Sequence, residues 1–404
     1  MTNFIITPQH ILTALKNNEF VYYYQPKISL ITGKVVGAEA LIRWIKPDGT
    51  IIRPDHFIPL AEQHNIIQHI TYQMFSKLAR DILILSDINN ELLISFNTNA
   101  KDFETIDFAV MVLDTLNKLH INPEKLQIEI TETTVLNTNP NIKKHIQLLC
   151  NQNIGLLMDD YGIGYSSLDS LGQWPFTAIK LDKGIINRML DSPKNRTIVE
   201  SSIRMAHELE INTIAEGVET DLQYKILLEA GCTKAQGFWL SKPLPLDQFI
   251  NFIKEDFRWS GLPVGLIHMA IVDHIQWRKK LITDIVHIAS LPKNSRDCFI
   301  NELSALEHYD CRLGQWYYGI GQYYKGYDYF DDIDEPHKKF HALGKQMVHI
   351  VSHNGSLTDL TPIMEEFSNY SIIILDLLQK LEQRGLLEMN SAHKEWQEYQ
   401  LSTE

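Results

Sequence analysis

Short apolar and β-branched runs alternate with longer amphipathic stretches over the first 255 residues of the chain. The runs that predict strands are residues 20–28, 35–42, 92–97, 126–131, 155–160, 178–181, 212–216 and 235–240. From the second run onward each is followed by helical or loop character, which is typical of βα units and a parallel sheet. Only residues 29–34 separate the first two runs, which is too short for a parallel crossover, so these strands should be antiparallel. The pattern predicts a modified (β/α)8 barrel with one reversed strand. A doubly wound sheet is the alternative, although it normally needs fewer strands.

The C-terminal part of the chain has a helical period instead. Four amphipathic segments, at 268–289, 296–324, 336–352 and 360–387, predict an antiparallel four-helix bundle. Nine of the 16 histidines lie within 265–404, and a Gly- and Pro-containing stretch precedes this region. We therefore expect a barrel at 1–257, a linker at 258–265, a helical domain at 266–390 and a C-terminal tail at 391–404.

Composition narrows the class of partner. The 404 residues carry 50 acidic and 37 basic side chains, a net charge of −13, which argues against a nucleic-acid polymer but not against a small phosphate ligand. No apolar run approaches the roughly 18 residues of a membrane span, and the N-terminus has no secretory pattern. The four cysteines are too scattered for a disulfide framework, so the sequence is interpreted as cytoplasmic, without membrane insertion.

Polar side chains fall late in nearly every predicted strand. They are Glu39, Asn97, Glu129, Asp159, Asp160, Lys180, Asp182 and Glu216, while Gln236 opens the last predicted strand. One such residue alone would most often cap a helix, and a single lysine could extend out of the barrel to solvent. Strand ends converge at the mouth of a barrel, however, and several carboxylates there would repel one another unless cations bind among them. Oxygen ligands favour two Mg²⁺ or Mn²⁺ ions, an arrangement suited to in-line hydrolysis of a phosphodiester.

These residues also occur in motifs that resemble a known family. The motifs, in order, are Tyr24-Gln25-Pro26-Lys27, Glu39-Ala40-Leu41-Ile42-Arg43-Trp44, Ser95-Phe96-Asn97, Glu129-Ile130-Thr131-Glu132, Asp159-Asp160-Tyr161-Gly162-Ile163-Gly164, Lys180-Leu181-Asp182, Ala215-Glu216-Gly217-Val218-Glu219 and Gln236-Gly237-Phe238. From about residue 5 to 255 the chain thus resembles the EAL-domain phosphodiesterases, which hydrolyse cyclic di-GMP to linear 5′-pGpG.

The resemblance implies a role for each site residue. Glu39, Asn97, Glu129 and Asp159 would bind one metal ion, and Asp159 and Asp160 would help to hold the second. Lys180, Glu216, Asp160 and Gln236 would be the catalytic group that completes the site and orients or activates the attacking water. Gln25, Leu41 and Arg43 would bind substrate, with Arg43 on a phosphate. Glu132 would anchor the loop 160–168, which joins metal binding to dimer contacts in the family.

Two positions depart from the usual family pattern. Ile163 replaces the common Thr or Ala, and its β-branch should stiffen the loop. Phe96 is bulkier than the usual aliphatic residue. No metal-binding or catalytic position is replaced, and the chain lacks a Gly-Gly-Asp-Glu-Phe cyclase signature.

A second candidate metal site lies in the helical region. His337 and His341 are spaced i, i+4 on one predicted helix face, with Cys311 and His274 on two other predicted helices. Three imidazoles and one thiolate could close a tetrahedral Zn²⁺ site. The motifs around His274, Cys311 and His337 make residues 266–385 resemble the chemoreceptor zinc-binding (CZB) domain, which implies one Zn²⁺ on these four ligands.

The sequence therefore predicts an enzyme, a zinc-responsive cyclic di-GMP phosphodiesterase that works as a homodimer and signals to a protein partner. The alternative is a non-hydrolytic cyclic di-GMP receptor whose helical domain transmits the signal. A purely structural zinc, acting as a staple, is the alternative for the bundle.

Overall fold

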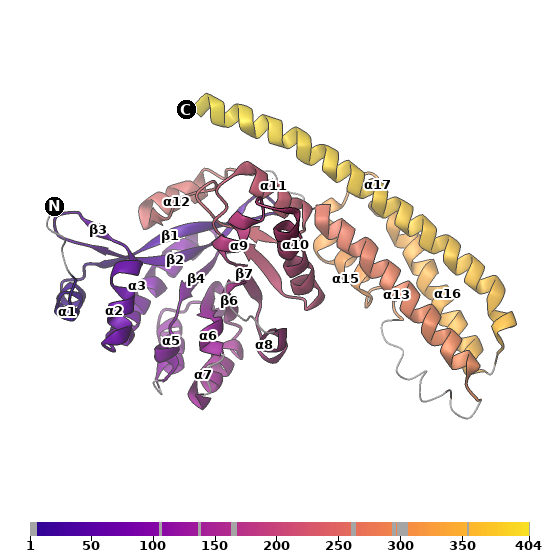
Figure 1. Ribbon diagram of the computed structural model, residues 1–404, viewed down its shortest axis with the longest axis horizontal. Helices are drawn as coiled ribbons and strands as arrows, with labels where there is room; N and C mark the ends of the chain where they lie inside the picture. The colour runs from indigo at the N-terminus through magenta and orange to yellow at the C-terminus, as the bar shows by residue number, and fades with distance from the viewer. Residues whose placement is uncertain are drawn as a thin grey trace. The chain divides into compact units, whose positions relative to one another are not determined.

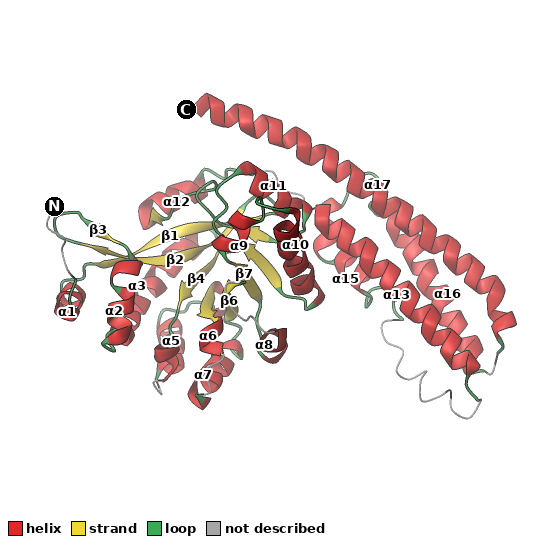
Figure 2. Ribbon diagram, viewed as in Figure 1, coloured by secondary structure: helices red, strands yellow, loops and turns green. Residues whose placement is uncertain are grey.

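The computed structural model describes residues 6–104, 107–135, 139–162, 168–259, 264–292, 296, 306–353 and 355–403. The chain divides into two compact units, Met1–Leu228 with Cys232–Gly261, and Leu262–Glu404 with Glu229–Gly231. The first unit combines strands and helices, and the second is helical (Figures 1 and 2). Among the described residues, no helix has both the length and the apolar character that a membrane span needs.

Eight strands of the first unit close into a barrel in the order β1-β9-β8-β7-β6-β5-β4-β2, and β2 pairs back with β1. Their bounds are β1 (Phe20–Ser29), β2 (Val35–Ile45), β4 (Leu93–Asn97), β5 (Leu126–Thr131), β6 (Gly155–Tyr161), β7 (Ala178–Leu181), β8 (Asn212–Ala215) and β9 (Lys234–Ala235). β1 runs antiparallel to β2 and β9, while the other barrel pairings are parallel. The predicted modified (β/α)8 barrel with one reversed strand is confirmed. Two short strands, β3 (Ile51–Ile52) and β10 (Leu244–Pro245), pair antiparallel with β2 and β1.

Helices follow the strands and cover the outside of the barrel (Figure 1). They are α1 (Pro8–Lys16), η1 (Pro54–His56), α2 (Ile58–Gln63), α3 (Ile67–Ile88), α4 (Ala100–Glu104), α5 (Phe108–Lys118), η2 (Pro123–Lys125), α6 (Glu132–Val135), α7 (Pro140–Cys150), α8 (Leu168–Gln173), α9 (Lys183–Arg188), α10 (Pro193–Glu208), α11 (Asp221–Glu229) and α12 (Leu246–Lys254). Between helices and strands lies an apolar layer, in which Phe20, Trp44 and Phe57 form an aromatic cluster with ring centroids 5.2–5.9 Å apart.

The turn between β1 and β2 depends on a glycine. Gly33 has a φ of +67°, which side chains rarely tolerate, and a Cβ there would lie 1.9 Å from the Trp259 carbonyl oxygen. The Trp259 amide donates to the Gly33 carbonyl at 2.9 Å. The segment after α12 is thereby tied to the hairpin that carries β1.

The last barrel strand is shorter than the predicted run 235–240. β9 ends at Ala235, and Gln236 follows it, so the expectation that Gln236 opens the strand is wrong. After Gln236 the backbone bonds to Val218 in both directions, with Val218 donating to Gln236 and Trp239 donating to Val218. A Cβ at Gly237 would lie 2.1 Å from the Val218 carbonyl oxygen, so only glycine allows this close approach. Residues 237–240 therefore form a turn and do not continue the strand.

Among its described residues, the second unit has three long helices and one short one, and Arg296 is helical as well. These helices are α13 (Val264–Ser290), α15 (Arg312–Tyr318), α16 (Asp334–Ser352) and α17 (Leu357–Thr403), with 3₁₀ turns at η4 (Ile320–Tyr324) and η5 (Asp331–Ile333). Phe340 of α16 stacks on Phe367 of α17, with ring centroids 4.1 Å apart. Trp277 of α13 packs against Phe340 at 5.4 Å, which joins the three long helices in one core.

Two helix predictions need correction. The expected helix 296–324 is not continuous: Arg296 is helical, residues 306–311 form turns, and α15 spans only Arg312–Tyr318, while residues 297–305 lie outside the described part. The segment 391–404, expected as a tail, continues α17 as far as Thr403. α13 starts at Val264, so it includes the last two residues of the expected linker.

Candidate functional site

The predicted polar residues of the barrel strands converge on Lys180 of β7. Its ammonium lies 3.0 Å from Asp159 Oδ1, 2.6 Å from Glu216 Oε1 and 3.3 Å from Glu39 Oε2, and it also pairs with Glu129 Oε2. The Lys180 side chain is 1% exposed, so it does not extend out to solvent. Side chains from β2, β5 and β6 and the residue after β8 thus meet at one point, as expected for strand ends in a barrel.

Two amides hold Glu39 in this cluster. Asn97 Nδ2 donates to Glu39 Oε1 at 2.7 Å, and Gln236 Nε2 donates to Glu39 Oε2 at 2.6 Å. Gln236 Nε2 also reaches Glu216 Oε1 at 3.1 Å. The Gln236 Oε1 atom is buried and has no hydrogen-bond partner among the described residues.

The electrostatics of the cluster are dominated by burial. Burial raises the pKa of Glu39, Asp159 and Asp160, and it raises that of Glu216 well above the usual range. Burial alone would lower the pKa of Lys180, but Asp159, Glu129, Glu216 and Glu39 hold it well above the ordinary value. Without metal ions, Lys180 is therefore a protonated counter-ion and not a base.

Glu129 is the exception among these carboxylates. Burial opposes its ionisation, but the ammonium groups of Lys180 and Lys27 outweigh burial and lower the pKa of Glu129 to about 2. Its Oε1 atom lies 2.9 Å from Lys27 Nζ, while its Oε2 atom pairs with Lys180. Glu129 is thus ionised and fully partnered.

The donor set fits hard divalent cations. Glu39, Glu129, Asp159, Asp160 and Glu216 supply five carboxylates, and Lys27 and Lys180 supply two ammonium groups, which leaves three negative charges when all are ionised. The unpartnered Gln236 oxygen is one more acceptor at the same place. Cations with oxygen ligands, such as Mg²⁺ or Mn²⁺, would relieve both features.

The backbone at Asp160 is unusual for a strand end. Asp160 has a φ of +59°, and its amide donates to the Asp159 side chain at 3.0 Å. This geometry turns the chain at the end of β6, so the Asp159 and Asp160 carboxylates point in different directions. Asp182, which helps to raise the pKa of Asp160, caps α9 through the Gly184 amide at 2.7 Å.

The three predicted substrate-binding residues lie on the β1–β2 hairpin. Leu41 and Arg43 follow Glu39 at alternate positions of β2, which places the three on one face of the strand, and Gln25 pairs with Glu39 across the hairpin. Gln25 Nε2 donates to the Ser241 carbonyl at 3.3 Å. Arg43 donates to the Ile42 carbonyl at 2.8 Å and lies over the Tyr23 ring at 5.8 Å. A cavity of about 440 Å³ is lined by Leu41 and Asn97 together with residues of the layer outside the barrel, such as Met74 and Phe96.

Of the remaining predicted positions, some lie outside the described residues and one, Phe96, is described. Glu132 starts α6, but its side chain and the loop 163–167, with Ile163, lie outside the described residues. Phe96 is 2% exposed and packs on Phe75 of α3 at 5.5 Å, so the bulkier residue fills the layer outside the barrel. Lys27, whose ammonium contacts Glu129, was missed. Its signal was a charged residue inside a strand of aromatic and apolar residues.

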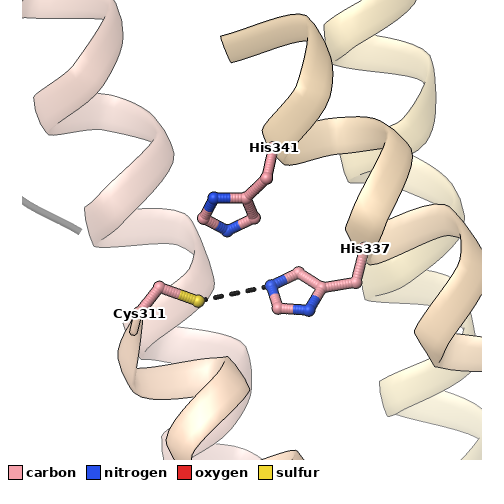
Figure 3. Close-up of side chains that lie close together, drawn as sticks. All are labelled: Cys311, His337 and His341. Carbon is pink, nitrogen blue, oxygen red and sulfur yellow. Dashed lines mark hydrogen bonds between the residues drawn. The ribbon is translucent and has the colours of Figure 1, made fainter. Parts of the chain in front are cut away.

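The second unit brings together three of the four predicted zinc ligands. The candidate ligand atoms of Cys311, His337 and His341 all lie within 4.8 Å of one another and are buried (Figure 3). The Cys311 sulfur lies 3.3 Å from His337 Nε2. His341 Nδ1 lies 3.0 Å from the Leu306 carbonyl, while its Nε2 atom is buried with no partner among the described residues. A ring nitrogen held by a carbonyl leaves the other free as a ligand, so the group fits Zn²⁺.

The sequence predicted Cys311 inside a helix, but the structure places it just before one. It is the N-cap of α15, with φ −72° and ψ 156°, and its sulfur accepts from the Gly314 amide at 3.2 Å. A Cβ at Gly314 would lie 1.9 Å from the His308 carbonyl oxygen. Only glycine therefore allows α15 to approach the His308 carbonyl this closely. The Cys311 sulfur at the start of α15 faces His337 of α16.

His274 stands apart from the three-ligand group. Its Nε2 atom lies 2.9 Å from Ser371 Oγ of α17. Burial, with a contribution from His341, lowers the pKa of His274 to about 3, and burial lowers those of His337 and His341 to about 2 and about 4. All three imidazoles are neutral, the form in which histidine binds metals.

Comparison with known proteins gives the class of the chain. Residues 9–243 match the family model of the EAL domain, and residues 274–348 match that of the chemoreceptor zinc-binding domain. The chain belongs to the EAL family and carries a CZB domain after the barrel. The matched CZB region contains His274, Cys311, His337 and His341.

Individual relatives agree with this assignment. The barrel is 33% identical over 242 residues to the cyclic di-GMP phosphodiesterase RocR of Pseudomonas aeruginosa, covering 60% of this chain and 62% of RocR. It is 37% identical over 242 residues to the signaling protein YkoW of Bacillus subtilis, covering 60% of this chain and 30% of YkoW. Among solved structures, the PaMucR phosphodiesterase in complex with c-di-GMP superposes with a TM-score of 0.57 at 31% identity, covering 60% of this chain and 98% of that one. The chain thus spans less than two thirds of these two curated relatives.

Proposed function

We propose that this protein is a metal-dependent phosphodiesterase that opens cyclic di-GMP to linear 5′-pGpG. One observation carries the proposal: in an EAL-family barrel, the carboxylates of Glu39, Glu129, Asp159 and Glu216 all pair with Lys180 at the strand ends, and Asp160 follows directly after Asp159. The relative RocR is named a cyclic di-GMP phosphodiesterase, and the PaMucR structure contains c-di-GMP, which supports this substrate.

The proposed site holds two divalent cations. Glu39, Asn97, Glu129 and Asp159 would hold the first, and Asp159 and Asp160 the second. Two Mg²⁺ or Mn²⁺ ions would supply an activated water and neutralise charge on the phosphate. Asn97 donates to Glu39 at 2.7 Å in the structure and offers its amide oxygen as a ligand.

The chain's own side chains then serve hydrolysis. Arg43 and Gln25 bind and orient the phosphodiester at the β1–β2 hairpin, and Leu41 lines a cavity together with Asn97. The water oxygen forms a bond to phosphorus while the bond to the 3′ oxygen breaks, and that oxygen takes up a proton. Glu216 and Gln236 orient the water. Lys180 stabilises the developing charge, and it becomes a candidate base only when cations replace it as counter-ion to the carboxylates.

The test is hydrolysis by the purified full chain. Cyclic di-GMP is incubated with Mg²⁺ or Mn²⁺, and the products are separated by chromatography and identified by mass. Linear 5′-pGpG is expected. Tight binding of cyclic di-GMP without hydrolysis, at saturating metal, would instead support the non-hydrolytic receptor.

We further propose that Zn²⁺ on the CZB domain regulates the barrel through a homodimer. Cys311, His337 and His341 would hold the ion together with His274, once the His274 ring leaves Ser371. One ion on ligands from α13, α15 and α16 would join three helices, so its loss should loosen the bundle. In this scheme residues 1–257 hydrolyse, residues 266–390 sense zinc, and the linker at 258–265 connects them.

A buffered zinc series separates this regulation from zinc acting at the barrel. Hydrolysis is measured at saturating Mg²⁺ for the wild type and for His341→Ala, with light scattering to follow dimer formation. The wild-type rate should change with zinc while the variant's rate stays constant. Identical responses of the two proteins would contradict the proposal.

A further inference from the structure

One buried lysine of the barrel has no role in the function proposed above. Lys27 lies near the end of β1, and its side chain is 2% exposed. Its ammonium lies 2.9 Å from Glu129 Oε1 and donates to Ser95 Oγ at 2.5 Å. Removing an ammonium from water is unfavourable unless it is paired, so the contact with Glu129 is what allows the charge to remain there.

The two oxygens of Glu129 are divided between two lysines. Oε1 pairs with Lys27, and Oε2 pairs with Lys180. Lys180 belongs to the group of carboxylates at the mouth of the barrel, where Glu39 and Asp159 also lie. The two contacts therefore orient the carboxylate at both of its oxygens.

Strand direction shows on which side Lys27 lies. In the antiparallel register of β1 and β2, Gln25 faces Glu39 and Lys27 faces Gly37. Gly37 precedes Glu39 on β2, so Lys27 is displaced from Glu39 toward the amino ends of the parallel strands, away from the mouth. Glu129 Oε1 is therefore held from below.

We propose that Lys27 is a positioning residue for the metal ligand Glu129. By holding Oε1 on the floor side, Lys27 leaves Oε2 as the oxygen directed at the cation in the mouth. A carboxylate without this partner would be buried with an unsatisfied oxygen and would turn to find another contact. Groups that orient a ligand in this way typically change metal affinity by about 10–100-fold when removed. The inference rests on the proposed function, in which Glu129 binds a divalent cation.

The experiment measures Mn²⁺ affinity directly on the zinc-loaded full chain, from the electron paramagnetic resonance signal of free Mn²⁺. Lys27→Met is compared with Lys234→Met. Lys234 is a second lysine of the barrel unit, on β9, and it makes no ion pair among the described residues. We expect the Mn²⁺ Kd to rise at least about tenfold for Lys27→Met and to stay within about threefold for Lys234→Met.

Hydrolysis gives a second measurement that a purely structural role would not alter in this way. The Mn²⁺ concentration for half-maximal activity should rise for Lys27→Met, while the KM for cyclic di-GMP at saturating Mn²⁺ stays unchanged. If circular dichroism shows that Lys27→Met does not fold, Lys27→Gln, which keeps one donor without the charge, is judged by the same criterion.

The outcomes separate a failure of this inference from a failure of the proposed function on which it rests. If Glu39→Ala retains wild-type Mn²⁺ affinity, the barrel metal site itself is wrong. If Glu39→Ala loses affinity while Lys27→Met keeps it within threefold, the positioning role alone is overturned. Equal losses for Lys27→Met and Lys234→Met would also overturn it, since any buried positive charge would then act alike.

Discussion

Gln236 donates from Nε2 to Glu39 Oε2 at 2.6 Å, across 197 positions of sequence. Glu39 lies on β2 and Gln236 follows β9, so the bond connects the two neighbours of β1, the reversed strand that lies between them. The bond also fixes the amide so that its oxygen is buried without a partner among the described residues. The contact both closes the barrel at its mouth and leaves one acceptor free there.

The first prediction concerns this contact. Gln236→Leu keeps the approximate volume but removes the donor to Glu39 and the free oxygen. The rate of cyclic di-GMP hydrolysis should fall about 10–100-fold, because a group that orients a ligand is lost. Steady-state kinetics at saturating Mn²⁺ check this. Gln223→Leu, whose side chain serves the start of α11, is the comparison, and an equal loss of activity there would refute a specific role for Gln236.

The second prediction concerns the carboxylate itself. Glu39→Ala should lower hydrolysis by at least about 100-fold and weaken Mn²⁺ binding, since a direct ligand is removed from a site that depends on its metals. The fold should remain, because the variant relieves crowding among buried acids. Glu335→Ala, at a side chain 71% exposed on α16, should behave like wild type. Normal production of 5′-pGpG by a folded Glu39→Ala protein would show that Glu39 is no ligand.

The third prediction concerns zinc. Cys311→Ala combined with His337→Ala should abolish zinc binding, because the variant removes two of three clustered ligands. Mn²⁺ binding should persist, since the barrel offers oxygen ligands and the bundle offers sulfur and nitrogen. Elemental analysis after dialysis measures both metals. His349→Ala, an exposed residue of the same helix, is the matched control. Full zinc occupancy in the double variant would rule out the site.

The fourth prediction is a pH dependence of stability. Burial raises the pKa of Asp102 from 3.8 to about 6 in the fold, and the side chain is 1% exposed. An acid with a raised folded pKa is harmless below pH 4, where it is protonated in both states, and becomes unfavourable as pH rises through 6. At about 1.36 kcal/mol per unit, the stabilisation lost by pH 7 is at most about 3 kcal/mol.

Asp102→Asn should therefore gain on the wild type between pH 4 and pH 7, as measured by urea unfolding at each pH. Its Oδ2 atom accepts from the Asn99 amide at 2.9 Å, and the asparagine oxygen can keep that bond. Asp376→Asn, at an exposed position of α17, should track the wild type across the range. A constant difference between Asp102→Asn and wild type would show that Asp102 does not titrate in this window.

The fifth prediction concerns the core of the helical unit. Phe367 is fully buried and stacks on Phe340. Phe367→Ala should destabilise this unit by about 3–5 kcal/mol through lost contacts and a cavity. Ile372→Ala on the same helix, 59% exposed, should change stability by less than about 0.5 kcal/mol. Hydrogen exchange of peptides from α13, α16 and α17 measures the effect in this unit alone, and equal protection in both variants would contradict it.

The sequence predicted a strand well where the run of apolar residues ends at the same residue as the strand itself. Glu129 and Lys180 could be found because an ionisable residue inside an apolar run is conspicuous. β9 was predicted too long because Phe238, Trp239 and Leu240 extend the apolar run, although residues 236–240 turn back over Val218. A single sequence does not distinguish such a turn from a buried strand. Lys27 is also a charged residue inside an apolar run, but its pairing with Glu129, 102 positions away, has no signal in a single sequence.

The helical unit shows the same limit. The i, i+4 spacing of His337 and His341 was enough to place both on one face, and they do lie together. The helix through Cys311 was wrong because hydrophobic periodicity continues through the N-cap of α15 at Cys311, where the backbone is extended and not helical. His274 has the right residue type, but its present hydrogen bond is to Ser371, a contact with no sequence signal.

The reversal of β1 determines which end of the barrel each of its residues can serve. The other seven barrel strands present their carboxyl ends at the mouth, whereas β1 enters there and leaves at the opposite end. Gln25 is therefore at the level of Glu39, and Lys27 is lower. If β1 ran parallel to the other strands, Lys27 would lie closer to the mouth than Gln25. Its ammonium would then compete with cations for the same carboxylates. The direction of one strand thus keeps the Lys27 ammonium beneath the proposed cation site and out of its entrance.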